Sequence, residues 1–310
     1  MAFGQALLDL APTHPELVVL DADVSSSTQT IHFGKAHPER FFNVGVAETN
    51  MVDVAAGLAA CGLRPVVSSF SLFLAHKCAE QIHNVLCYNE LPVVLVGGYA
   101  GLSDSFDGAS HQTVADLAAL RALPNLTDIV PADGTETRQA LAAALRRSGP
   151  TFIRISRNPS PMLFADAEPF EIGRARRVRE GKDLTICVCG VPTAMAMEAA
   201  DALAREGIGV DLLVVSTLKP LDAEAIAASA ARTGRVLTVE EHSTIGGLGG
   251  AVAEALALRR PTPMEFVGVA DCFAESGPYE ALMAKYGISV EAIVAKARRF
   301  KMLRGASAVQ

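Results

Sequence analysis

The sequence predicts an α/β protein made of two doubly wound domains. Short apolar segments of strand length alternate with helical segments along most of the chain, as in parallel sheets that carry helices on both faces. Some of these segments are uninterrupted, such as PVVLV at 92–96, which is typical of a strand buried on both faces. At roughly 150 residues per domain, the length of 310 residues also indicates two domains.

The first domain is expected over residues 1–160. It is expected to contain helices at 3–10, 51–60, 113–122 and 135–147, and strands at 17–20, 41–44, 65–68, 92–96, 128–130 and 151–155. Two segments are expected to be loops, the Ser/Thr-rich stretch 25–30 and the glycine-containing stretch 97–112. Loops as long as the second are usually functional in compact domains.

A linker is expected at 161–182, where prolines accumulate and the alternation of strands and helices is lost. The second domain then covers residues 183–310. Its expected strands are 184–188, 210–215, 236–239 and 264–269, and its expected helices are 192–205, 223–232, 250–258, 278–285 and 290–300. This alternation predicts a mostly parallel sheet.

Composition argues against several classes of protein. The net charge of −7 and the absence of a Lys/Arg-rich run argue against nucleic-acid binding. No apolar run reaches about 18 residues and the N-terminus has no basic leader, so we expect a soluble, cytoplasmic protein without a membrane partner. The six cysteines form no CxxC pair, which favours free thiols over a zinc site.

One carboxylate stands where a strand is expected to turn into a helix. Glu48 follows the strand at 41–44 and Gly45, and ligands bind at the carboxyl ends of strands in open α/β sheets. A carboxyl held there among apolar residues could share a proton with a ring nitrogen. The alternative is that Glu48 only occupies the first helical turn, where the helix dipole favours an acidic residue.

Other candidates lie in the loops and at a strand end. Asp107 and His111 form a possible acid/base or hydroxyl-binding pair in the loop at 97–112. Arg157 follows a strand and could hold a phosphate, although a surface salt bridge is the alternative. The hydroxyls around Ser27 suit a phosphate or a polyol, but serine is also common in loops for its turn chemistry.

Together these stretches resemble the C-terminal half of transketolase, a thiamine-diphosphate enzyme, and most of all the C-terminal subunit of two-gene transketolases. The resemblance covers essentially the whole chain. The matching segments include LDADVSSST, RFFNVGVAETNM, EQIHN, DGASHQ, GPTFIRISR, STLKPLD, VEEHSTIGGLGGAVAE and ESGPYEALMAKYG. The resemblance implies that 1–160 is the family's pyrimidine-binding domain and that 183–310 is its C-terminal domain.

The resemblance also implies roles for single residues. Glu48 matches the glutamate that hydrogen-bonds the cofactor's aminopyrimidine ring, and Glu48 and His111 are the implied catalytic residues. Phe70 matches the position that stacks on this ring, with Phe73 beside it, although ordinary core packing would also explain both. The implied substrate-binding residues are Ser27, Asp23, Tyr99, Asp107, His111 and Arg157.

Within this substrate channel, Ser27, His111 and Arg157 would face the substrate phosphate, and Asp107 would face a hydroxyl. Tyr99 stands where the family usually has a histidine, and Phe106 stands where it has a glutamate. Tyr99 is bulkier than histidine and neutral, which puts the ordinary ketose-phosphate donor in doubt, and Phe106 removes a charge from the loop. We therefore expect an altered sugar specificity or a specialised pathway role.

The family's diphosphate-binding GDG…N segment does not occur in this sequence. The resemblance therefore implies that an N-terminal subunit holds the diphosphate and a Mg²⁺ or Ca²⁺ ion, that the two kinds of chain form an α2β2 heterotetramer, and that this chain holds no metal. The implied reaction transfers a two-carbon ketol unit from a ketose to an aldose, and a phosphorylated ketose is the expected donor. Alternatives are the β subunit of a 2-oxoacid dehydrogenase that serves a lipoyl or carrier protein, a 1-deoxyxylulose-5-phosphate synthase, and a non-catalytic scaffold.

Overall fold

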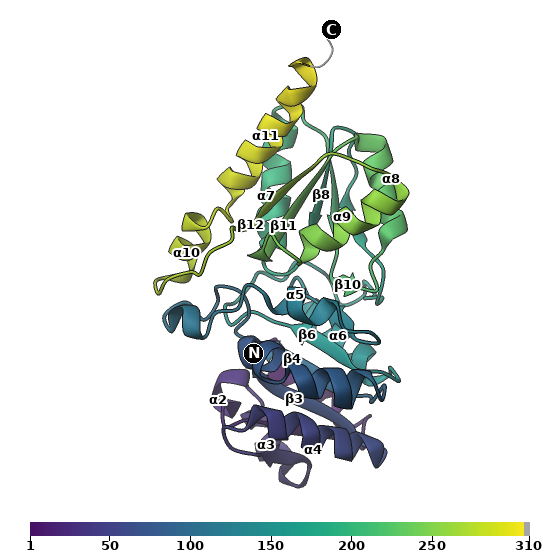
Figure 1. Ribbon diagram of the computed structural model, residues 1–310, viewed down its shortest axis with the longest axis vertical. Coiled ribbons are helices and arrows are strands. Elements are labelled where there is room, and N and C mark those ends of the chain that lie inside the picture. Colours follow the sequence, from purple (N-terminus) through teal and green to yellow (C-terminus); the bar gives the residue numbers. More distant parts are fainter. Residues whose placement is uncertain (307–310) are drawn as a thin grey trace.

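The computed structural model describes residues 1–306, so residues 307–310 of the predicted second domain lie outside the described residues. Two sheet-and-helix units follow one another along the longest axis of the molecule (Figure 1). The N-terminus lies in the first unit, and the chain ends at the far end of the second. Two doubly wound, mostly parallel units confirm the predicted fold class.

The first unit is built on a seven-stranded sheet with the strand order β10-β5-β6-β4-β3-β1-β2. Neighbouring strands run parallel throughout, except that β10 is antiparallel to β5. The strands are β1 (Leu17–Asp21), β2 (Phe41–Asn43), β3 (Arg64–Phe70), β4 (Val94–Gly98), β5 (Thr127–Ile129), β6 (Thr151–Arg154) and β10 (Thr217–Lys219).

Helices cover both faces of this sheet because successive strand residues point to opposite sides. Val18 and Leu20 belong to the core that contains helix α4, whereas Leu17 and Val19 belong to the core that contains α1 and α6. The helical segments are α1 (Ala2–Leu10), α2 (Ser25–Thr28), α3 (Ile31–Ala36), η1 (Pro38–Arg40), α4 (Glu48–Ala60), η2 (Phe73–Lys77), η3 (Gln81–Cys87), η4 (Gly108–Ser110), α5 (Asp116–Arg121) and α6 (Gly134–Leu145).

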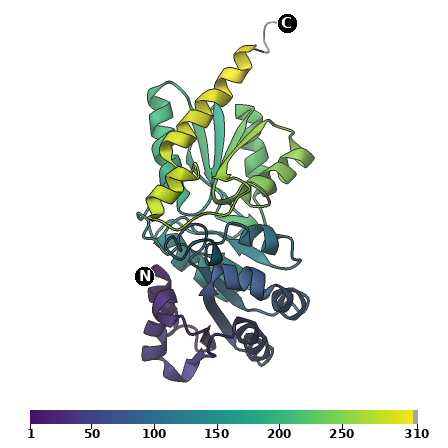
Figure 2. The same cartoon turned by 60° about the vertical axis from the view of Figure 1, so that its left-hand side comes forward.

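The second unit has a five-stranded sheet with the order β12-β11-β8-β9-β7, in which only β7 is antiparallel to its neighbour. Helices α7 and α11 pack on one face, and α8 and α9 pack on the other, as the turned view in Figure 2 shows. The elements are β7 (Arg176–Arg179), β8 (Leu184–Val188), α7 (Pro192–Arg205), β9 (Val210–Val214), α8 (Ala223–Thr233), β11 (Val236–Ser243), α9 (Leu248–Arg259), β12 (Met264–Val269), α10 (Tyr279–Lys285) and α11 (Val290–Ala306).

The Ser/Thr-rich stretch was expected to be a loop, but it contains the short helix α2 and continues into α3. The cause is the buried carboxylate of Asp21 at the end of β1. It accepts hydrogen bonds from the Val24 amide at 2.7 Å and from the Thr28 and Thr30 hydroxyls, both at 2.8 Å. These bonds close the chain over the strand end, so the expectation of an open loop is wrong.

Strand β10 crosses between the two units, since its residues come from the second part of the chain and pair with β5 of the first sheet. The predicted linker also contains a whole strand, because β7 (Arg176–Arg179) lies within it. The domain boundaries at 160 and 183 therefore stay predictions. In the part of the chain that the structure describes, no helix combines the length and apolar character needed to cross a membrane.

Candidate functional site

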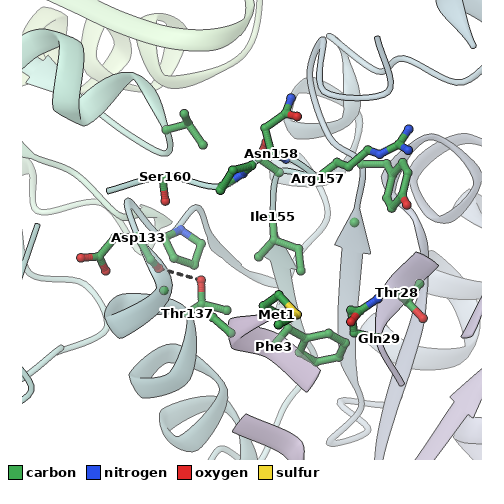
Figure 3. Close-up of a pocket in the computed structure, with 18 of the residues that line it drawn as sticks. Met1, Phe3, Thr28, Gln29, Asp133, Thr137, Ile155, Arg157, Asn158 and Ser160 are labelled. Carbon is green, nitrogen blue, oxygen red and sulfur yellow. Dashed lines mark hydrogen bonds between the residues drawn. The ribbon is translucent and has the colours of Figure 1, made fainter. Parts of the chain in front are cut away.

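A cavity of about 660 Å³ opens at the carboxyl ends of the first sheet (Figure 3). Its walls include residues just after β4, β5 and β6, together with helix α2 and the start of α1. This is the edge at which parallel α/β sheets bind ligands. Three predicted site residues line the cavity, namely Ser27, Tyr99 and Arg157.

Arg157 makes three contacts, two through its guanidinium and one through its backbone amide. Its guanidinium carbon lies 4.9 Å from the centre of the Tyr99 ring, and its Nη1 atom lies 3.3 Å from Oδ1 of Asp104. Its backbone amide donates to the Ser103 hydroxyl at 3.1 Å. The side chain remains about half exposed and reaches the cavity, so it can still donate to a ligand there.

Tyr99 adopts a left-handed backbone conformation, with φ +59°. Such a φ is uncommon for a bulky residue and marks local strain, which concentrates at functional sites. The ring stacks on Phe70 at a centroid distance of 4.3 Å and an interplanar angle of 17°. The strained turn directly after β4 thus places the Tyr99 ring between Phe70 and Arg157.

Phe70, Phe73 and His111 form the rest of this aromatic group. The rings of Phe70 and Phe73 are 5.9 Å apart and nearly parallel, and the imidazole of His111 meets both edge-on at 6.1 Å and 5.5 Å. Strand β3 supplies Phe70, the π-helix η2 supplies Phe73, and the loop after β4 supplies His111. The structure therefore brings five predicted residues together, since Tyr99 and Arg157 continue the same group.

Glu48 is the first residue of α4, and only 3 % of it is exposed. It follows a turn at Gly45, where φ is +73°. Its carboxylate accepts a hydrogen bond from Lys77, the last residue of η2, whose side chain is about half exposed. A buried acceptor whose partner reaches in from solvent suits a site where a ring nitrogen takes the partner's place. The sequence offered no signal for Lys77, because its approach depends on how η2 packs against α4.

The remaining predicted residues, Asp107 and Asp23, lie outside the lining of the cavity. Asp107 stands beside the buried Asp104, whose pKa is raised to about 6 by burial and then by Asp107, while His111 and Arg157 oppose the rise. Asp23 accepts a hydrogen bond from the Asn43 side chain at 2.9 Å. Asp104 escaped sequence reasoning, although it lies in the predicted functional loop.

Hydrogen bonds from the second unit fix the loop after β4, which contains Asp104 and Asp107. Glu241, at the end of β11, accepts hydrogen bonds from the Leu102 amide at 2.7 Å and from the Tyr279 hydroxyl at 2.8 Å. The amide of Gly277 donates to the Ser105 carbonyl at 2.9 Å. The conformation of the loop therefore depends on contacts from both units.

A cluster of buried ionisable side chains connects the two sheets next to this loop. Arg154 of β6 donates to Asp116 at 2.7 Å and to the Glu241 carbonyl at 3.0 Å. His242 Nε2 lies 3.7 Å from the other oxygen of Asp116, and burial lowers the pKa of His242 to about 4. Burial also raises the pKa of Glu240 and of Glu241 to about 7. These groups are buried between the two units, so we assign them a structural role in holding the units together rather than a role in binding a ligand.

Among the side chains that the structure describes, no group of three or more His, Cys, Asp or Glu residues is placed to hold a metal ion. The position of a metal therefore stays a prediction. The arrangement of Glu48 and the aromatic group fits a flat, nitrogen-containing ring, since it offers an acceptor and stacking surfaces.

Comparison with known proteins places this geometry in a family. Residues 1–161 match the family model "Transketolase, pyrimidine binding domain", and residues 173–293 match "Transketolase, C-terminal domain". The chain is 40% identical to a putative transketolase C-terminal section from Methanocaldococcus jannaschii, over 94% of this chain and 92% of that protein.

Two further similarities are as extensive. The chain is 39% identical to a 6-deoxy-6-sulfo-D-fructose transketolase subunit from Clostridium sp. (strain MSTE9), over 93% of this chain and 89% of that protein. A solved structure described as a split gene transketolase, inactive beta4 tetramer, is 46% identical. It matches with a TM-score of 0.90 and covers 96% of each chain.

Proposed function

The chain belongs to the transketolase family, and from this we propose that it is the C-terminal subunit of a split, thiamine-diphosphate-dependent transketolase. In this proposal it takes part in moving a two-carbon ketol unit from a ketose to an aldose. The observation that carries the proposal is the buried Glu48 at the start of α4, on the same edge of the sheet as the aromatic group and the cavity.

Bound thiamine diphosphate would supply the carbon atom that takes up and releases the ketol unit. Glu48 would hold a proton at the aminopyrimidine ring nitrogen, in place of its present bond to Lys77. Phe70 and Phe73 would offer apolar ring faces, and His111 would stand at their edge toward the substrate. Glu48 and His111 are the catalytic residues that we propose.

For the substrate, we propose that Ser27, His111 and Arg157 receive an anionic group at the far end of the sugar, that Asp107 contacts a hydroxyl, and that Asp23 belongs to the same channel. The cavity between Ser27 and Arg157 supports the first part. The similarity to a subunit named for 6-deoxy-6-sulfo-D-fructose supports a ketose with such a group, a sulfonate or a phosphate, at its terminal carbon. Tyr99 stacks on Phe70 here and would shape the same channel.

The proposal includes an N-terminal partner subunit that holds the diphosphate and a Mg²⁺ or Ca²⁺ ion in an α2β2 assembly. Its support lies in the names of similar proteins. One relative is called a C-terminal section, another a subunit, and the similar structure is called an inactive beta4 tetramer of a split-gene enzyme. An inactive tetramer of β chains fits an enzyme that needs a second kind of chain.

Calorimetric titration tests the split site. Thiamine diphosphate with Mg²⁺ is titrated into this chain alone, and then into the chain mixed with the N-terminal subunit. We expect binding only in the mixture, and tight binding by this chain alone would contradict the proposal. Absence of binding in both would favour the scaffold alternative.

The Glu48→Gln variant tests the chemistry in the assembled enzyme. We expect a loss of activity of about 10²-fold or more, typical of a lost proton-handling group. Glu206→Gln is the matched control, because Glu206 is an exposed glutamate of the second unit that pairs with Arg298. Unchanged activity in Glu48→Gln would exclude its role. Transfer to a lipoyl group, with none to an aldose, would support the dehydrogenase alternative.

A further inference from the structure

A buried carboxylate lies directly against the arginine that we propose for substrate binding. Asp104 is fully buried, yet Oδ1 is 3.3 Å from Nη1 of Arg157. Its other oxygen, Oδ2, accepts no hydrogen bond from the residues that the structure describes. A buried charge needs compensation, and the Arg157 guanidinium is the cation beside Asp104 that supplies it.

Arg157 has little freedom to leave this carboxylate. Its guanidinium carbon lies 4.9 Å from the centre of the Tyr99 ring, and its backbone amide is fixed to the Ser103 hydroxyl next to Asp104. The half-exposed side chain nevertheless lines the cavity (Figure 3). One guanidinium therefore serves the buried carboxylate and any anion in the cavity.

We propose that Asp104 is a specificity-determining residue, which competes with the anionic group of the substrate for Arg157 and so sets how strongly the enzyme prefers charged over uncharged ketoses. The inference rests on the proposed function and deepens it. When Asp104 is ionised, its carboxylate largely neutralises the charge of Arg157, and an anion in the cavity then gains little binding energy from the guanidinium. With Asp104 neutral, the full charge of Arg157 is available to that anion.

The neighbouring charges determine when Asp104 is ionised. Burial and the adjacent Asp107 raise the pKa of Asp104 to about 6, while His111 and Arg157 oppose this rise. Above about pH 6 the carboxylate therefore weakens anion binding at Arg157, and below it the protonated form does not. Anion affinity should rise as the pH falls from about 7.5 to about 5.5.

The test compares 6-deoxy-6-sulfo-D-fructose with D-fructose as donors for the assembled enzyme. A sulfonate keeps one negative charge across this pH range, so any pH response belongs to the protein. For Asp104→Asn we expect the ratio of kcat/KM for the sulfonated sugar to that for the neutral sugar to rise about fivefold or more at pH 7.5. The change should appear in KM, as expected for one charge at a half-exposed site.

Two further variants isolate the mechanism. Asp104→Asn should give no gain in an Arg157→Gln background, because the cation that both anions share is then absent. Asp166→Asn is the matched control, since Asp166 is an exposed aspartate that pairs with Arg138 away from this arginine. An unchanged ratio in Asp104→Asn, or an equal rise in both backgrounds, would overturn the proposal.

A binding measurement keeps this test separate from the proposed function. Inorganic sulfate is titrated into the full chain alone at pH 5.5 and 7.5, and we expect wild type to bind it several-fold more tightly at pH 5.5. The difference should persist in His111→Asn, which excludes the imidazole as its source, and should vanish in Asp104→Asn. Equal affinity at both pH values, or no sulfate binding in any variant, would refute the role of Asp104. A lack of ketol transfer from every donor would refute only the proposed function.

Discussion

Replacing Gly101 by alanine should uncouple the functional loop from the second unit. Gly101 follows Tyr99 in the loop after β4 and has φ +66°. A Cβ atom there would lie 2.6 Å from Cδ of Glu241, so the carboxylate would have to move. The same carboxylate holds the Leu102 amide and the Tyr279 hydroxyl, and both bonds would weaken.

The magnitude follows from two contributions. Placing alanine in the left-handed region costs about 1–2 kcal/mol. Loss of one hydrogen bond to a charged group adds about 1.5–3 kcal/mol. We therefore expect Gly101→Ala to lower the free energy of unfolding by about 2.5–5 kcal/mol in urea titrations followed by circular dichroism.

Gly207 provides the matched control in the same chain. Its φ is +74°, and a Cβ atom there would meet nothing within 4 Å. Gly207→Ala should therefore cost only the backbone part, about 1–2 kcal/mol. Equal destabilisation by the two variants would refute the argument that Glu241 anchors the loop. If the argument holds, Gly101→Ala should also reduce activity of the assembled enzyme, whereas Gly207→Ala should not.

Three further variants examine the rest of the site. Phe70→Ala should destabilise the chain by about 3 kcal/mol in urea and weaken thiamine-diphosphate binding in calorimetry of the assembly, and normal cofactor affinity would argue against its stacking role. Lys77→Met should lower the stability of the chain by about 3 kcal/mol, because the buried Glu48 carboxylate loses its cation, yet tighten cofactor binding, because Glu48 no longer has to exchange a partner; weaker binding would contradict this. Glu240 has its pKa raised to about 7 by burial, so its contribution to stability is present at acid pH and is lost as the pH rises through about 7. Glu240→Gln should therefore show a flatter melting temperature between pH 5 and 8 than wild type, measured by scanning fluorimetry.

Much of the fold was predictable because its strands are buried on both faces. The apolar run at 92–96 became β4, and the helix expected at 192–205 has the bounds Pro192–Arg205, beginning at a proline that suits a helix start. Strand β10 was missed because three residues of mixed polarity carry no periodic signal. Its existence depends on pairing with β5, a contact between distant parts of the chain.

The site was predictable to the extent that strand ends converge at one edge of a sheet. That rule identified Glu48 and Arg157 as candidates, whose roles stay predictions. It did not identify their charged partners, Lys77 and Asp104. Lys77 ends a π-helix in which the amide of Cys78 bonds to the carbonyl of Phe73, five residues earlier. This register differs from that of an α-helix, so helical periodicity could not orient Lys77. The position of Asp104 depends on the path of the loop after β4, which hydrogen bonds from the second unit fix, so the sequence could not place it.

The ion pairs Glu48–Lys77 and Asp104–Arg157 should respond differently to their ligands, the cofactor at Glu48 and the substrate at Arg157. Lys77 is half exposed, so a ligand can displace it from Glu48 and leave the ammonium group in water at little cost. Asp104 is buried beneath Arg157 and cannot move into water, so only protonation can remove its charge. Cofactor binding at Glu48 would then exchange one partner for another, whereas substrate binding at Arg157 would depend on a proton. If both pairs act as we propose, acidification should favour charged substrates through Arg157 without requiring any change at Glu48.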